Sequence, residues 1–171
     1  MKNAKALLAA AAVVAALSVS APMAQAKVYS IPAEDAIATV NVPDDWTTNE
    51  TDRGIELNSS DSGIYVDIEG VKANDVGTAV EDSVKLLASQ GLEIDESTKQ
   101  TSDTEANGLK MHDFLYKGKD KDGPTNFSIT LVETAVPDEF LMVTFWGSDA
   151  ATKANEKTIS AIANSVQLTK H

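Results

Sequence analysis

The protein has 171 residues, with 26 aspartates and glutamates against 14 lysines and arginines, which gives a formal net charge of −12 at pH 7. Nucleic acid and anionic lipid repel so acidic a chain, so we expect neither as a partner. The chain contains no cysteine, which excludes disulfides, thiolate metal sites, thiol nucleophiles and a lipid-modified N-terminal cysteine.

Residues 1–26 have the pattern of a secretory signal peptide. Lys2 and Lys5 supply a positively charged start, an apolar run follows over 7–19, and an Ala-x-Ala sequence ends at Ala26. The apolar run is shorter than the roughly 20 residues that span a bilayer, which favours cleavage after Ala26 over an uncleaved anchor. Removing 26 residues, two of them lysines, leaves 145 residues and a net charge of −14.

The remaining residues, 27–171, contain no repeat, no linker and no change in composition, so we expect a single globular domain. A chain of this size can bury a stable core without disulfides. Together with the signal pattern, the lack of cysteine predicts a bacterial protein that is periplasmic or secreted. No later segment is apolar enough to span a membrane after cleavage.

The first half of this domain is predicted to form strands. Residues 36–42 are small, apolar and β-branched, and Pro43 ends the run. Apolar residues alternate with polar ones over 55–57 and again over 64–68. The segment between them, 58–63, consists of turn-forming residues, which predicts a hairpin.

A helix follows this hairpin. Asp75 is placed to cap its first turn through the carboxylate, and Gly91 to end it in a left-handed conformation. Between them runs one apolar stripe at helical spacing, consisting of Val76, Val80, Val84 and Leu87.

The second half returns to strands. The polar stretch 92–105 is typical of one or two exposed strands near a sheet edge, and Asn107-Gly108 predicts a hairpin turn into a strand over 109–117. A second turn, 119–124, leads to alternating apolar residues over 127–131.

Residues 140–146 are apolar at both alternating sets of positions, which predicts a central strand packed on both faces. Ser148 or Asp149 then caps a last helix, whose apolar stripe is Ile159, Ile162 and Val166. Hairpin connections of this kind predict an α+β domain, with an antiparallel sheet of about six or seven strands covered by two main helices.

This order of elements and three short segments resemble the PsbP/Mog1-like fold and, within it, the exported bacterial DcrB-like proteins. The segments are Val42-Pro43-Asp44-Asp45-Trp46, Phe145-Trp146-Gly147-Ser148 and Asn164-Ser165-Val166. The resemblance implies an α/β/α sandwich and a non-catalytic accessory role. Members include an extrinsic photosystem subunit and a Ran-binding nuclear protein, so the fold alone carries little functional information and no binding residues are transferred.

We find no convincing catalytic or metal-binding motif. His112 is the only histidine inside the presumed fold, since the other, His171, is the last residue; its neighbour Asp113 should point to the opposite face of a strand, and no G-x-S-x-G sequence occurs. Residues 120–123 have some features of a calcium loop. An EF-hand aligned on the glycine would, however, have Gly118 and Ile129 at its first and last ligand positions, so a charged hairpin turn is favoured.

The segment Asp44-Asp45-Trp46 could suggest a carboxylate pair beside a sugar-stacking aromatic ring. The carboxylates of a glycosidase lie across a cleft from each other, so a turn that buries the indole is the better interpretation. Trp146 and Phe140 are likewise expected in the core. The sequence therefore predicts no catalytic residue, no cofactor and no metal site.

The remaining signal is charge. Five acidic residues gather in one polar stretch with only Lys99 opposing them: Glu93, Asp95, Glu96, Asp103 and Glu105. Such charges commonly keep a sheet edge soluble and unpaired. The functional alternative is a docking face for a basic partner.

We expect an exported, non-enzymatic accessory or binding protein that contacts another exported or membrane-bound protein. The alternative is a small-ligand-binding protein or a small enzyme with a pocket that the sequence does not reveal. A pocket lined by convergent polar groups would favour this alternative.

Overall fold

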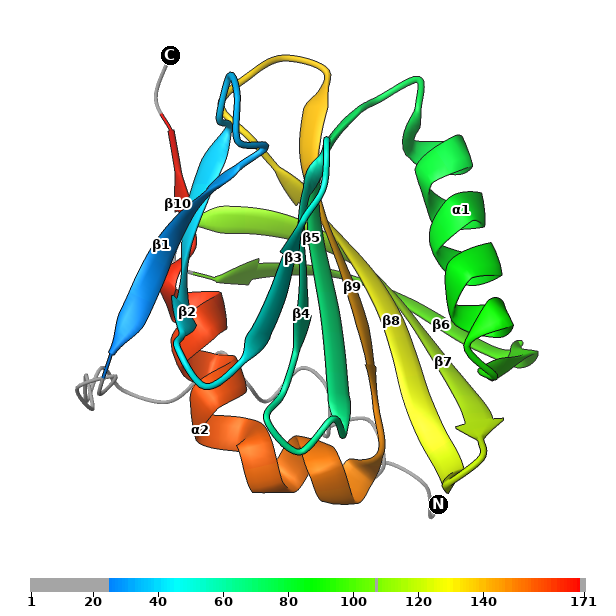
Figure 1. Ribbon diagram of the computed structural model, residues 1–171. Helices are drawn as coiled ribbons and strands as arrows, with labels where there is room; N and C mark the ends of the chain where they lie inside the picture. Colours follow the sequence, from blue (N-terminus) through cyan, green and yellow to red (C-terminus); the bar gives the residue numbers. More distant parts are fainter. Residues whose placement is uncertain (1–24, 107, 170–171) are drawn as a thin grey trace.

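The computed structural model describes residues 25–106 and 108–169 (Figure 1). The predicted signal peptide lies almost wholly outside these residues, as does Asn107 of the predicted hairpin turn. Among the described residues, no helix is long and apolar enough to cross a membrane.

The chain forms strands and two helices in an α+β order. The elements are β1 (Ala26–Ile31), β2 (Ala38–Pro43), β3 (Thr47–Glu50), β4 (Gly54–Asn58), β5 (Ile64–Lys72), α1 (Val76–Ser89), β6 (Glu93–Ala106), β7 (Leu109–Asp120), β8 (Gly123–Glu133), β9 (Glu139–Gly147), α2 (Asp149–Ser165) and β10 (Gln167–Leu168).

Seven of these strands form one antiparallel sheet in the order β3-β4-β5-β9-β8-β7-β6. Strand β9 is the middle strand, as its two-sided apolar pattern predicts, and β6 lies at an edge. The predicted hairpin between β4 and β5 is confirmed. The predicted sheet of six or seven strands with two main helices is therefore confirmed.

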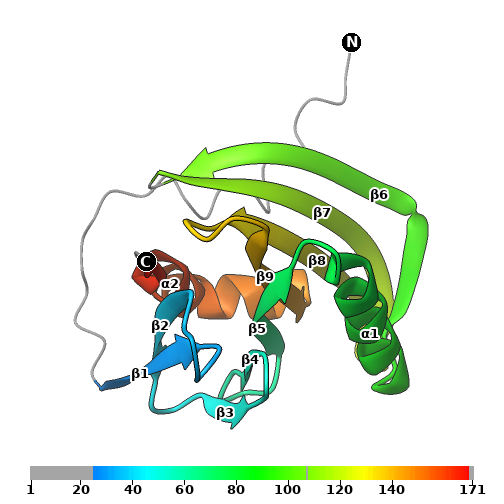
Figure 2. The ribbon, with the colours of Figure 1, turned by 90° about the horizontal axis from the view of Figure 1, so that it is seen from above.

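The two faces of this sheet carry two separate cores. Alternate residues of β9 divide between them: Leu141 and Phe145 pack in one cluster, and Met142 and Trp146 in the other. Helix α2 and a small sheet in the order β1-β2-β10 cover the first face, and α1 covers the second. The two views show α2 and the small sheet on one side of the large sheet and α1 on the other (Figures 1 and 2).

Both predicted helix stripes are confirmed. The apolar residues of α1 pack in the second cluster, with Leu87 fully buried, and those of α2 pack in the first, with Ile162 buried. Gly91 has a φ of 97°, and the amide of Leu92 donates to the carbonyl of Leu87 at 3.0 Å, so α1 ends with the expected left-handed residue.

The helix starts differ from each other. Ser148 Oγ accepts a hydrogen bond from the amide of Ala151 at 3.1 Å, which confirms the serine cap of α2. Asp75 precedes α1, but its carboxylate makes no capping hydrogen bond, so the cap predicted there is wrong. Its backbone is helical (φ −101°, ψ −7°), whereas a capping side chain reaches the first turn from an extended backbone.

The predicted strand count before α1 is also wrong, because β1 and β3 were not expected. Strand β3 is Thr-Thr-Asn-Glu and has no apolar alternation to reveal it. Strand β1 adjoins the predicted cleavage site, although its Tyr29 and Ile31 are buried. The strand predicted over 36–42 begins at Ala38 and belongs to the small sheet.

The contrast between the two helix starts gives a stability prediction. Ser148→Ala should lower the free energy of unfolding by about 1 kcal/mol, since it leaves an amide of the first turn without its acceptor. Asp75→Ala should cost roughly half of that or less, because only a charge interaction with the helix dipole is lost. Urea denaturation of the two variants measures the difference, and equal losses would contradict these cap assignments.

Candidate functional site

The five acidic residues of the predicted docking face all lie exposed on edge strand β6. The register places a basic residue of β7 opposite four of them: Glu93 opposite Lys119, Asp95 opposite Lys117, Asp103 opposite His112, and Glu105 opposite Lys110. Glu96 lies where this register shifts, between Asp95 and Gln100.

Two of these pairs are in contact. Lys119 Nζ lies 2.9 Å from Glu93 Oε2, and His112 Nδ1 lies 2.8 Å from Asp103 Oδ1. Opposite charges placed directly across a strand pair stabilise its register. Two of the five acidic side chains of β6 are thus paired within its own hairpin, and the docking role of this strand stays a prediction.

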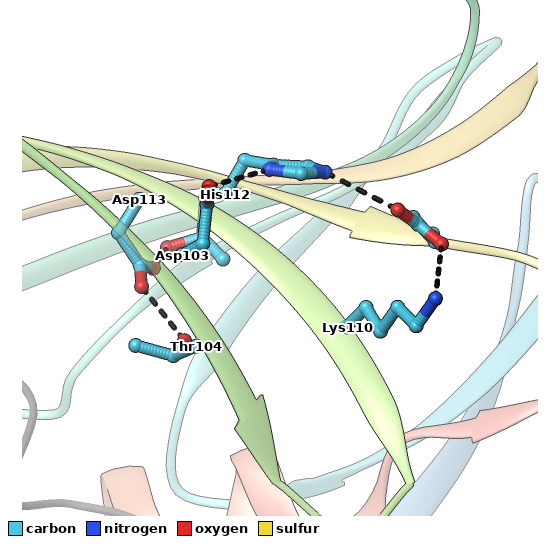
Figure 3. A network of polar contacts seen from close by, with 7 residues as sticks. Asp103, Thr104, Lys110, His112 and Asp113 are labelled. Carbon is cyan, nitrogen blue, oxygen red and sulfur yellow. Dashed lines mark hydrogen bonds and ion pairs between the residues drawn. The ribbon is translucent and has the colours of Figure 1, made fainter.

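His112 joins three strands of the sheet (Figure 3). Its Nε2 lies 3.3 Å from Glu133 Oε1, and Lys110 Nζ lies 3.9 Å from the other oxygen of Glu133. The hydrogen bonds to Asp103 and Glu133 raise the pKa of His112. Both ring nitrogens face carboxylates, so neither is placed to take a proton from a hydroxyl nucleophile.

Asp113, the neighbour of His112, takes part in separate contacts. Its two carboxylate oxygens accept hydrogen bonds from Thr104 at 2.9 Å and from Thr130 at 2.7 Å. The contacts of the two residues connect β6, β7 and β8, and His112 pairs with Asp103 and not with its neighbour Asp113. They therefore act in strand pairing.

The other sequence candidates have structural roles. Asp120 Oδ1 accepts from the amide of Asp122 at 2.8 Å, and its Oδ2 accepts from the indole of Trp146 at 3.1 Å, which confirms a hairpin turn. Trp46 is 5% exposed and lies in the first core cluster, so the buried indole is also confirmed.

The structure contains a hollow of about 480 Å³ beside α1, which the sequence did not predict and which is a candidate site. We call it the carboxylate groove, and it combines five carboxylates with a single arginine. Its lining residues are Thr51, Asp52, Arg53, Glu56, Asp67, Glu69, Asp82, Ser83 and Leu86.

Strand β5 supplies the floor of the carboxylate groove. Its even-numbered residues from Ile64 to Ile68 enter the first core cluster, so Asp67 and Glu69 face α1. They are only 6% and 5% exposed. Across the strand pairs, Asp67 lies opposite Glu56 of β4 on one side and Thr144 of β9 on the other.

Some of these polar groups have partners. Arg53 Nε donates to Glu69 Oε1 at 3.0 Å, and the Tyr65 hydroxyl donates to Glu56 Oε1 at 3.2 Å. Three buried oxygen atoms in this part of the sheet have none: Asp67 Oδ1, Glu69 Oε2 and Thr144 Oγ1. A buried polar group without a partner costs about 1–3 kcal/mol, which makes these three atoms candidates for contact with a ligand.

The electrostatics of the groove agree with this geometry. Burial, followed by the negative charges of Glu69 and Glu56, raises the pKa of Asp67 to about 8, against the opposing effect of Arg53. Burial and the nearby carboxylates also raise the pKa of Tyr65, so the phenol stays protonated. At neutral pH the groove therefore contains at least one carboxyl group that holds a proton.

A bare metal ion is a poor fit to these groups. In the part of the chain that the structure describes, no three His, Cys, Asp or Glu side chains come together in an arrangement that could hold a metal ion. Arg53 also places a positive charge in the groove. The groove suits a ligand that brings N–H donors and a positive charge.

The sequence contained a weak signal for this site. The polar residues of β5 alternate with apolar ones, which is typical of a strand with one wet face. The same alternate set also contains Tyr65 and Val71, which are buried at its two ends. Apolar residues on both sides of Asp67 and Glu69 indicate a covered face, but only the position of α1 shows what covers it.

The raised pKa of Asp67 gives a prediction of pH dependence. Between about pH 4 and pH 8 the folded state holds a proton that the unfolded chain releases, so the stability conferred by that proton falls progressively across this window and is lost above about pH 8. Asp67→Asn keeps the shape without the ionisation. Its stability advantage over the wild type should be about 1–3 kcal/mol larger at pH 9 than at pH 6.

Urea denaturation at the two pH values measures this effect. Asp52→Asn is the matched control, because Asp52 lines the same groove but is exposed. The assignment is wrong if Asp67→Asn changes stability by the same amount at pH 6 and pH 9.

Comparisons with known proteins relate the chain to others through its fold alone. No family model matches the sequence, and no curated protein matches it. Among solved structures, cyanobacterial PsbP (CyanoP) from Synechocystis sp. PCC 6803 is 10% identical with a TM-score of 0.55, covering 91% of this chain and 99% of its own.

Two further structures are similar. LpqN of Mycobacterium tuberculosis, which is involved in cell envelope biogenesis, is 11% identical with a TM-score of 0.52, covering 85% of this chain and 92% of its own. The Ran-binding protein Mog1p of Saccharomyces cerevisiae is 11% identical with a TM-score of 0.47, covering 84% and 95%. The chain has the PsbP/Mog1-like fold, as the sequence resemblance implies.

Proposed function

We propose that this protein is an exported binding protein that catalyses no reaction and receives a basic group of a partner protein in the carboxylate groove. The observation that carries the proposal is the pair of buried carboxylates, Asp67 and Glu69, each with an oxygen that has no partner. A site of this kind gains most from a cation that also donates hydrogen bonds.

The charge distribution supports the groove over β6 as the place of contact. On β6, four acidic residues face basic residues across the hairpin, whereas in the groove five carboxylates face one arginine. Asp52 and Asp82 are exposed at its rim, where their field attracts a basic surface. The partner is accordingly a basic exported or membrane-bound protein.

Three observations support an exported setting. The first is the signal pattern ending at Ala26. The second is that a chain beginning at Lys27 would start one residue into β1 and keep Tyr29 and Ile31 in the core. The third is the fold shared with LpqN, a protein of envelope biogenesis. A relation to the exported DcrB-like proteins is part of this proposal.

The same groove favours a second candidate function, binding of a small basic ligand. Its floor is buried and its polar groups converge beneath α1, as a small-ligand site requires. Its wide rim of exposed charges favours the protein partner as the first candidate.

The test is a crosslinking pull-down with the processed protein from its own envelope fraction, at low and high salt, read by mass spectrometry. A groove variant, Glu56→Gln with Asp67→Asn and Glu69→Gln, should lose at least about tenfold of the captured partner. A variant of β6 with charge reversal at Glu93, Asp95, Glu96 and Asp103 is the comparison.

Each outcome decides between the surfaces. Loss of a salt-sensitive partner in the groove variant, with retention in the β6 variant, supports the proposal. Loss in the β6 variant alone assigns docking to β6 and overturns it. Capture of no partner at either salt concentration also contradicts a protein-binding role, provided that circular dichroism shows both variants folded.

A further inference from the structure

The floor of the carboxylate groove is specific enough to indicate the chemistry of the group that it binds. We infer that the groove takes the primary ammonium group of a lysine side chain, held by Asp67 Oδ1 and Glu69 Oε2 beside Thr144. This inference rests on the proposed function and names the group of the partner that enters the site.

The number of free acceptors matches an ammonium group. Of the five buried side-chain oxygens that lack partners among the described residues, two belong to Asp67 and Glu69, which line the groove, and a third belongs to Thr144, directly opposite Asp67 on the neighbouring strand. A lysine ammonium has three N–H donors and no acceptor. Donors that diverge from one nitrogen suit acceptors on separate side chains.

A guanidinium group fits this floor less well. It binds best through two parallel N–H bonds to the two oxygens of one carboxylate. Glu69 offers only Oε2, because Arg53 Nε already occupies Oε1. The acceptors that lack partners are therefore single atoms on different residues, which a guanidinium cannot bind through two parallel bonds.

The entrance of the groove fits the stem of a lysine. Leu86 of α1 lines the groove and is 39% exposed, one of only two large hydrophobic side chains that the described residues leave exposed. An aliphatic stem can pack against it while the charged end reaches the floor. Asp52 and Asp82 stand exposed at the rim, where they attract the approaching cation.

Binding is coupled to loss of a proton. The charged and titratable groups around Asp67 are Glu56 of β4, Glu69 and Tyr65 of β5, Arg53 before β4, and the rim residues Asp52 and Asp82. An ammonium beside Asp67 favours its ionised form, so the carboxyl proton leaves to solvent as the ammonium enters. Affinity should therefore rise by up to about tenfold per pH unit between pH 6 and pH 8.

The test uses lysine with blocked termini, Nα-acetyl-lysine methylamide, added to the ¹⁵N-labelled processed protein. Amide shifts near Asp67, Glu69 and Ser83 should saturate at millimolar concentrations. Three analogues are the controls: blocked norleucine, which lacks the charge, blocked arginine, and blocked Nε-trimethyl-lysine, which has the charge without N–H donors. Each should bind at least about tenfold more weakly, which corresponds to 1.4 kcal/mol.

The variants Asp67→Asn and Asp52→Asn distinguish the contribution of the groove floor to binding from that of the rim. Asp67→Asn should weaken lysine binding and remove its rise between pH 6 and pH 8, whereas Asp52→Asn should keep that rise. Equal binding of arginine or trimethyl-lysine overturns the inference, as does the absence of any shift up to about 50 mM lysine derivative.

The two proposals fail separately. If the lysine derivative does not bind but the groove variant still loses its partner in the pull-down, the ammonium inference is wrong and the binding function stands. If the partner is captured equally by the groove variant, the proposed function is wrong, whatever the result with lysine.

Discussion

Strand β5 must serve two covered faces, and the proposed binding site depends on this constraint. It lies between β4 and β9, with α2 and the small sheet on one side and α1 on the other. A strand alternates its side chains between faces, so every second residue of β5 enters the covered space beneath α1 whatever its polarity. Asp67 and Glu69 occupy these positions, and burial of two carboxylates there costs free energy that a purely structural strand would avoid.

The two acidic regions of the protein therefore differ in kind. Strand β6 is more acidic in sequence, but β7 places a basic residue opposite most of its charges, so its charge serves strand pairing and protects an edge. The carboxylate groove has fewer exposed charges, but Asp67 and Glu69 retain oxygens without partners, and Arg53 neutralises one carboxylate only. Uncompensated charge, more than total charge, distinguishes a binding site from a solvated surface.

The sequence predicted those features that depend on local pattern. The apolar residues on both faces of β9 predicted its central position in the sheet. The apolar stripes predicted which face of each helix is buried, and Gly91 and Ser148 predicted where α1 ends and α2 begins. It failed where the outcome depended on distant packing. The cap at Asp75 needed a backbone angle that residue type does not determine, and the groove needed α1 to lie over Asp67 and Glu69. The alternation of polar and apolar residues in β5 is the same whether its polar face is exposed to solvent or covered by a helix.

The central claim is that Asp67 lies buried among other negative charges and holds a proton at neutral pH. A ¹³C NMR titration of the Asp67 carboxyl carbon, assigned by comparison with Asp67→Asn, tests this directly. The account predicts a midpoint near pH 8. A midpoint near 4 for Asp67 would show a solvated, ionised carboxylate. That result would contradict both the burial of Asp67 in the groove and the coupling of binding to loss of its proton.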